Sequence, residues 1–245
     1  YVVRALTGYP TSAPAQALAD VVRVDLTVPT DVHEALQGCW GVFGVTNFYD
    51  PKIKDDPESE ERQGKNLVDA ALAAGKYHVT QYIQETGLPA TFLYTGNFYE
   101  NMVYRSHMVY HRDKDQVEFL QPIVSVAMLY VEKNLSAITK AVLDHWGDEP
   151  CGAEPQVPLL CQRAALRSII AIAPSITGTP CACTILMTTH VPDRDIMLHL
   201  YNEMGMYGTK EIPDENVLKL GVRLHDIDNF VRSRLTLHLG LSVVV

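Results

Sequence analysis

Short apolar stretches alternate with helical patterns along the first part of the chain. Strands are predicted at residues 1–10, 21–26 and 41–47, and helices at residues 13–19, 29–36 and 64–74. Strands that alternate with helices in this way are typical of a parallel sheet with crossover helices, which is an α/β fold. The nearly continuous apolar run from 40 to 46 predicts a strand that is buried on both faces.

The sequence also predicts where two of these helices begin. Pro14 lies in the first turn of the first predicted helix, and Ser12 is placed to cap it. For the second predicted helix, Thr30 or Asp31 is expected to be the cap. Gly38 is expected to end that helix.

The alternation fails after the helix that ends at Gly75. Residues 79–87 predict another helix, and a strand follows only at residues 89–94. Two helices with no strand between them cannot continue a right-handed crossover pattern. We therefore expect a strand and its loop to be missing near residues 75–78. Beyond this point, helices are predicted at residues 136–146, 193–206 and 226–239, and a strand at 184–189.

The net charge and the cysteine content limit the kinds of partner, compartment and metal site that the sequence predicts. The net charge of −9 argues against direct binding to nucleic acid or to an anionic membrane, because the field of the protein repels phosphate. No apolar run approaches the ~18 residues that span a bilayer. Five cysteines without a regular framework predict a reducing compartment, the cytoplasm or the nucleus. Cys181 and Cys183 lack the second pair that a zinc site needs, so they are expected to be buried thiols in a strand, and no metal is predicted.

Two motif matches carry little weight. Gly38, Gly41 and Gly44 approximate a dinucleotide fingerprint, but they straddle a predicted strand instead of opening a helix, so we expect close packing against a helix. Tyr110 and Lys114 have the spacing of a catalytic tyrosine–lysine pair. They lie in a charged stretch that predicts an exposed turn, and no catalytic residue is therefore assigned.

Residues 94–104 form a more informative segment, because they follow a predicted strand and combine aromatic with amide side chains. Such a loop suits a planar ring together with an amide or a ribose, which it can hold by stacking and hydrogen bonds. A purely structural turn is the alternative.

Taken in order, several short runs resemble the NmrA-like family of atypical short-chain dehydrogenase relatives, one type of which is a redox-sensing NADP-binding protein. The runs are VRALTG, VVRVDL, GVFGVTNFYD, GKNLVDAALAAG and GLPATFLYTGNFYENM. The resemblance implies an α/β fold with a Rossmann-like doubly wound parallel sheet and a smaller C-terminal α+β lobe. Residues 1–150 would form the NAD(P)-binding core and residues 151–245 the lobe.

The resemblance also implies a set of cofactor-binding residues. Asp25 and Leu26 would face the adenine, and Lys76 the ribose. The ribose and nicotinamide side would be lined by Thr46, Asn47 and Phe48. The nicotinamide end would be contacted by Phe98, Tyr99, Glu100 and Asn101.

Two departures from the family pattern bear on the cofactor. Gly8 stands where the family usually has an arginine for the 2′-phosphate, so the expected cofactor is NADP or NAD. The first strand and its glycine-rich phosphate turn are expected to precede Tyr1. Without that turn, we expect the printed chain to bind a dinucleotide weakly.

For function, the resemblance implies a redox- or cofactor-sensing regulator, linked to transcriptional regulation, that acts through a protein partner. A homodimer is also considered. The alternatives are an NAD(P)-dependent oxidoreductase or biosynthetic enzyme of the same group, and a cofactor-free interaction protein. Because the tyrosine–lysine match lies in an unsuitable context, we expect a regulator rather than an enzyme.

Overall fold

The computed structural model describes residues 1–47, 56, 58–73, 91–104, 108–121, 125–146, 157–160, 163–190, 192–207 and 211–243. The chain divides into two compact units. The first comprises Tyr1–Ala90 with Gly147–Gln156, and the second comprises Thr91–Trp146 with Val157–Val245. The predicted helix at residues 79–87 lies outside the described residues. The predicted division at residue 150 stays a prediction.

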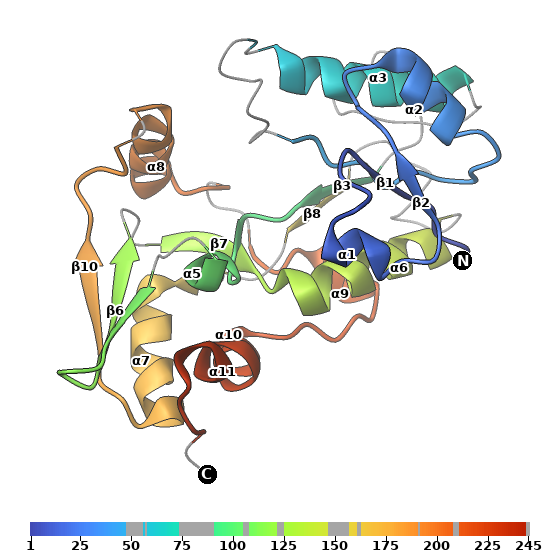
Figure 1. The fold of residues 1–245 in the computed structure, drawn as a ribbon. Helices are drawn as coiled ribbons and strands as arrows, with labels where there is room; N and C mark the ends of the chain where they lie inside the picture. The colour runs from blue at the N-terminus through green and yellow to red at the C-terminus, as the bar shows by residue number, and fades with distance from the viewer. Residues whose placement is uncertain are drawn as a thin grey trace. The chain divides into compact units, whose positions relative to one another are not determined.

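The first unit contains a parallel strand pair and two neighbouring helices. Strand β1 (Ala5–Thr7) pairs in parallel with β2 (Val21–Arg23), and the short helix α1 (Ala13–Gln16) lies between them in the chain. Helices α2 (Pro29–Ala35) and α3 (Ser59–Ala73) lie side by side (Figure 1). The predicted strand–helix alternation is confirmed for this part.

Small and branched apolar side chains form the core of the first unit. The helix α3 turns Leu67, Ala70 and Ala71 toward this core, a spacing that places them on one helical face. They pack with Val24, Val32 and Leu36. The Arg4 guanidinium donates to the carbonyl oxygens of Ala35 and Gln37 at 3.1 and 3.2 Å, which satisfies carbonyl groups at the end of α2.

The predicted doubly buried strand at residues 41–47 is wrong. These residues have no regular secondary structure, and Trp40, Phe43 and Val45 are 54%, 51% and 68% exposed. Among the described residues no strand pairs with this segment. Without ladder hydrogen bonds it does not form a strand, although Val42 packs on the core and Asn47 is hydrogen-bonded to α3. Gly44 behaves as expected, since a Cβ atom there would overlap Cδ2 of Leu67 on α3.

The predicted cap of α2 is also wrong. The residue before α2 is Val28, and no side chain caps this helix; Pro29, in the first turn, has no N–H that needs a partner. The Asp31 carboxylate instead accepts a hydrogen bond from the backbone N–H of Asp25. Ser12 stands at the N-cap position of α1, as predicted, but its hydroxyl makes no cap hydrogen bond, and Pro14 lies in the first turn.

In the described part of the second unit the strands form three small sheets. In one, β6 (Gln116–Gln121) pairs in parallel with β10 (Cys181–Ile185) and antiparallel with β5 (Met108–His111). In the others, β3 (Thr91–Tyr94) pairs in parallel with β8 (Val157–Leu160), and β7 (Ser125–Leu129) lies between β4 (Asn97–Phe98) and β9 (Arg163–Ala165). The strand predicted at 184–189 therefore begins earlier, at Cys181, because its pairing with β6 defines it.

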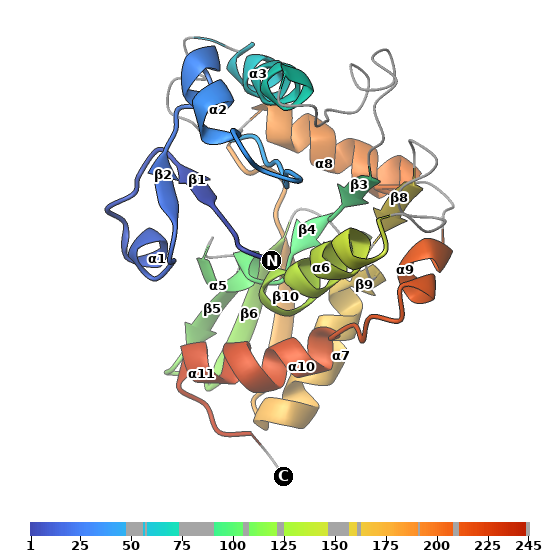
Figure 2. The same ribbon diagram turned by 90° about the vertical axis from the view of Figure 1, so that its right-hand side faces the viewer.

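Helices of the second unit pack on these strands. They are α5 (Asn101–Tyr104), the run η2 (Val131–Leu135) to α6 (Ser136–Asp144), α7 (Leu166–Thr177), α8 (Pro192–Met204), α9 (Glu215–Lys219), and the run α10 (Ile227–Phe230), η3 (Val231–Leu235) and α11 (Thr236–Leu239). Figure 1 shows α7 between β10 and the C-terminal helices, and Figure 2 shows α7 beside α10. The core includes the fully buried Phe119, Tyr130 and Phe230. The helices predicted at 136–146, 193–206 and 226–239 are confirmed within one or two residues.

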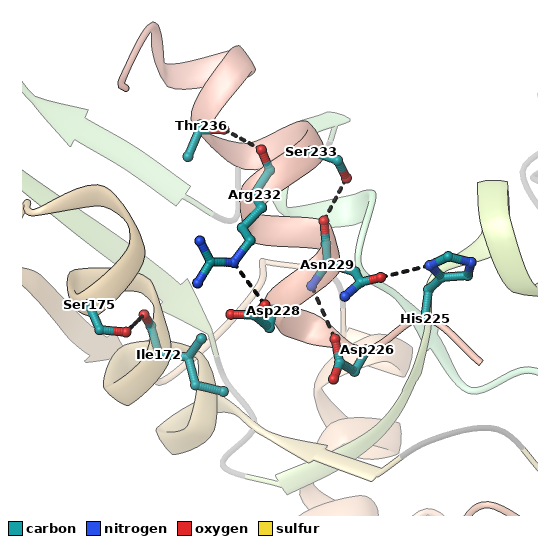
Figure 3. A network of polar contacts seen from close by, with 9 residues as sticks. All are labelled: Ile172, Ser175, His225, Asp226, Asp228, Asn229, Arg232, Ser233 and Thr236. Atoms are coloured by element: carbon teal, nitrogen blue, oxygen red, sulfur yellow. Dashed lines mark hydrogen bonds and ion pairs between the residues drawn. The ribbon is translucent and has the colours of Figure 1, made fainter. Parts of the chain in front are cut away.

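A chain of hydrogen bonds fixes the start of the C-terminal helical run (Figure 3). Asp226 caps it by accepting from the backbone N–H of Asn229 at 3.1 Å, and Asn229 Oδ1 lies 2.7 Å from His225 Nδ1. The buried Asn134, in η2, donates to the carbonyl oxygen of His225 and accepts from its N–H, both at 2.8 Å. The Asn134 side chain thus fixes His225, the residue that precedes the cap of α10.

Candidate functional site

The loop that follows β2 is held in a defined conformation. Asp25 Oδ1 accepts hydrogen bonds from the backbone N–H and the hydroxyl of Thr27, at 2.9 and 2.6 Å, in an Asx-turn. Next in the chain, the carbonyl oxygen of Leu26 accepts from Asn66 Nδ2 at 2.9 Å. Two predicted adenine-side residues therefore lie in a turn that α3 helps to fix.

The same helix holds the second predicted segment. The Thr46 hydroxyl donates to Glu60 Oε1 at 2.7 Å, and the backbone N–H of Asn47 donates to Gln63 Oε1 at 2.9 Å. Phe48 and Lys76, which were predicted to contact the same ligand, lie outside the described residues.

Helix α3 thus connects the two loops of the first unit. Glu60, Gln63 and Asn66 are three residues apart, so they project from neighbouring positions of one face. Gln63 is only 2% exposed, and a polar side chain is seldom buried without such a partner. Sequence reasoning missed these three residues. Glu60 and Gln63 precede the helix predicted at residues 64–74, whereas α3 begins at Ser59.

In the second unit, two of the four predicted residues at 98–101 make contacts within the protein itself. Tyr99 is 1% exposed and its ring lies 5.5 Å from that of Phe230; burial raises the pKa of its hydroxyl. The Glu100 carboxylate accepts from the backbone N–H groups of Val131 and Glu132 at 3.2 and 2.9 Å, at the start of η2. Phe98 and Asn101 are half-buried on either side of this pair.

Gly96 explains how this loop reaches its position. Its φ of +65° lies in the left-handed region that favours glycine, and a Cβ atom there would overlap the carbonyl group of Ala127. Its N–H donates to the Tyr207 hydroxyl at 3.1 Å, and the Tyr207 ring lies 5.9 Å from that of Tyr94. Sequence reasoning did not select Gly96 or Tyr207, because Tyr207 is distant in the chain.

The structure gives the tyrosine–lysine match no catalytic geometry. Tyr110 lies within β5 and its hydroxyl donates to Asp115 Oδ1 at 2.6 Å, while Lys114 lies in the exposed turn that was predicted. The hydrogen bond to Asp115 raises the pKa of Tyr110, which is the opposite of what a proton-exchanging tyrosine needs.

The cysteines and the acidic residues do not form a metal centre among the described positions, where no group of three histidines, cysteines or carboxylates is arranged to hold an ion. Cys181 and Cys183 are free, half-buried thiols in β10, as the strand assignment predicted. Burial raises the pKa of Cys181 to about 11.

Among the residues that the structure describes, no helix is both long and apolar enough to cross a membrane.

Comparison with known proteins agrees with the early resemblance. No family model matches the chain. Over 129 residues, half of its length, it is 33% identical to the NmrA-like family domain-containing oxidoreductase ptmS of Penicillium ochrochloron. This match supports the resemblance to the NmrA-like family. The alignment covers 38% of that relative's own length, so it spans well under half of it.

Solved structures confirm the fold. The negative transcriptional regulator NmrA, crystallised with NAD, superposes with a TM-score of 0.73 over 96% of this chain and 88% of its own, at 15% identity. Triphenylmethane reductase of Citrobacter sp., complexed with NADP(H), gives a TM-score of 0.62 over 91% and 85% of the two chains, at 16% identity. The chain therefore has the Rossmann-like α/β fold that the sequence predicted.

Proposed function

We propose that this NmrA-like chain binds a nicotinamide dinucleotide, NADP or NAD, and is a cofactor-sensing regulator that acts through a protein partner. One observation carries the proposal. The loops at residues 25–26 and 46–47 are both hydrogen-bonded to one face of α3, and they are the segments in which the family resemblance places the adenine and ribose contacts. Ligands of open α/β sheets bind at such loops, beyond the carboxyl ends of the strands.

The roles of individual residues follow the same scheme. Asp25 and Leu26 would line the adenine, and Thr46, Asn47 and Phe48 the ribose. Lys76 would also contact the ribose, and the residues 98–101 would meet the nicotinamide end. The bound cofactor would supply redox chemistry; these side chains would bind and orient it. Relatives of the same fold carry NAD or NADP(H) in their crystals, which supports a dinucleotide as the ligand.

The choice between NADP and NAD turns on Gly8. A Cβ atom at this position would meet only the carbonyl oxygen of Val24, 3.9 Å away, and glycine offers no guanidinium to a 2′-phosphate. A charge-assisted contact of that kind contributes about 1.5–3 kcal/mol. We therefore expect the two cofactors to bind with affinities within about tenfold of each other.

The regulator is preferred to the oxidoreductase because the Tyr110 hydroxyl is hydrogen-bonded to Asp115 and its pKa is raised. The oxidoreductase remains the second candidate, because the matched relatives include an oxidoreductase and a reductase. We expect a reducing compartment, the cytoplasm or the nucleus, because the five cysteines of the sequence form no regular framework.

The first experiment titrates the protein with NADPH and with NADH and measures the binding by calorimetry. Saturable binding is expected. Asn47→Ala should weaken it by roughly tenfold, because it removes polar contacts to the ribose side. Asn202→Ala, on α8, is the matched control and should leave the affinity unchanged. A protein that binds neither cofactor would favour the cofactor-free alternative.

The second experiment separates sensing from catalysis. NADPH oxidation is followed with a panel of carbonyl compounds, using the protein and its Tyr110→Phe variant. The regulator predicts no sustained turnover by either. Sustained oxidation by the protein would establish the oxidoreductase, and its loss in Tyr110→Phe would return this tyrosine to a catalytic role.

A further inference from the structure

The segment at residues 41–47 is fixed by side chains of α3. Among the described residues no strand pairs with it, so in that part of the chain no sheet hydrogen bonds define its backbone. Gly44 instead lies against α3, where a Cβ atom would overlap Cδ2 of Leu67. Three residues later, the N–H of Asn47 donates to Gln63 Oε1 at 2.9 Å. The segment therefore follows α3 from Leu67 back to Gln63, one helical turn earlier.

Gln63 is buried and its orientation is determined. Its side chain is 2% exposed, and it lies one turn before Leu67 on the face of α3 that packs on the core. Because the N–H of Asn47 can only donate, the oxygen of the amide must face it. The amide nitrogen donates to the hydroxyl of Ser59, also buried, at 3.4 Å. A buried amide is tolerated when its polar atoms are paired in this way.

Asn66 holds the loop at residues 25–26. Its Nδ2 donates to the carbonyl oxygen of Leu26 at 2.9 Å, next to the turn that the Asp25 carboxylate closes. Asn66 lies three residues after Gln63, so the two side chains are neighbours on one helix. A single rigid element thus sets the backbone of both loops.

The two bonds fix loop backbone and leave the loop side chains to a ligand. The bond from Asn47 uses its backbone N–H and not its side-chain amide. At Leu26 the bond uses the carbonyl oxygen. A loop that is fixed before its ligand arrives loses less conformational freedom on binding, which strengthens the complex.

We infer that Gln63 is a positioning residue that sets the backbone of Asn47 for the ribose and nicotinamide side of the dinucleotide, and that Asn66 positions Leu26 for the adenine side. The inference rests on the proposed function, since it assigns the two loops to the two halves of a bound cofactor. Neither Gln63 nor Asn66 needs to touch the cofactor for this role.

Amide hydrogen exchange of the whole protein, followed by NMR without cofactor, tests the contact to Gln63. The N–H of Asn47 should exchange slowly. Gln63→Met keeps the length of the buried side chain but has no oxygen, and should speed this exchange by about tenfold or more. Gln63→Glu keeps an acceptor oxygen and should restore most of the protection. Lys65→Ala, at an exposed position of α3, is the matched control and should behave like the unaltered protein.

The ligand role is tested with NADPH and with the two halves of the cofactor, 5′-AMP and nicotinamide mononucleotide. Calorimetry gives the Kd for NADPH, and NMR shift titration to about 10 mM gives those for the halves. Gln63→Met should raise the Kd for NADPH and for nicotinamide mononucleotide by roughly tenfold and leave that for 5′-AMP unchanged. Asn66→Ala should weaken NADPH and 5′-AMP to a similar degree and leave nicotinamide mononucleotide unchanged. Circular dichroism confirms that each variant is folded.

This crossed pattern separates positioning from a purely structural role, because a variant that only destabilised the fold would weaken both halves alike. Equal losses for both halves, an unchanged Kd for NADPH in Gln63→Met, or exchange at Asn47 that ignores Gln63 would overturn the inference. So would an unaltered protein that binds NADPH but neither half. If the unaltered protein does not bind NADPH while exchange at Asn47 still depends on Gln63, the proposed function fails, and the ligand role of Gln63 fails with it.

Discussion

At the scale of single residues, Glu100 shows how a predicted ligand contact can also hold the fold together. Both of its carboxylate oxygens accept backbone N–H groups, one from Val131 and one from Glu132, where the helical run of η2 begins. The first N–H groups of a helix have no partner within the helix, so a side chain that accepts from them is stabilising.

Replacing Glu100 should therefore cost stability. Glu100→Ala is expected to lower the free energy of unfolding by about 1–2 kcal/mol, and Glu100→Gln, which keeps one acceptor oxygen, by about half as much. Urea denaturation measures both. If Glu100→Ala left stability unchanged but weakened NADPH binding, the cap would be unimportant and the carboxylate would serve the cofactor alone.

At the scale of elements, Gly96 permits the close approach of β4 to β7. Gly96 and Gly221 have the same φ of +65°, but a Cβ atom at Gly96 would lie 2.8 Å from the carbonyl carbon of Ala127, whereas one at Gly221 would meet nothing within 4 Å. Gly221→Ala should cost only the left-handed conformation, about 1 kcal/mol. Gly96→Ala must also displace backbone and should cost about 3 kcal/mol or more. Equal shifts in the urea midpoint would contradict this packing.

The sequence predicted elements well where the pattern is local. The helices at 136–146, 193–206 and 226–239 and the parallel pair β1–β2 follow from periodicity and punctuation. It failed where partners are distant. The run from 40 to 46 is apolar enough for a buried strand, yet only a pairing partner makes a strand of it. Conversely, β10 extends back to Cys181 because β6, far earlier in the chain, supplies its hydrogen bonds.

The residues of the candidate site divide in the same way, into those that the sequence selected and those that it missed. Asp25 and Thr46 were selected because the resemblance to the NmrA-like family places cofactor contacts at these positions. Gln63 and Asn66 were not, since their importance comes from loops that fold back onto α3. Tyr99 was selected for its aromatic ring, which the structure buries against Phe230. The sequence pattern shows which side chains are suited to a ligand. Only packing shows which of them already make contacts within the protein.

At the scale of the whole molecule, the net charge of −9 bears on how a regulator of this kind would act. Nonspecific binding to DNA is driven by lysine and arginine that neutralise phosphates and release counterions, and it gives Kd values of about 10⁻⁴–10⁻⁶ M in proteins adapted to it. An acidic protein repels the duplex instead. We expect fluorescence anisotropy with a labelled DNA duplex at low salt to show no binding at about 10 μM protein, with or without NADPH. Binding that weakens steeply as salt is added would reveal a local basic surface, and the regulator would then contact DNA directly and not only through a protein partner.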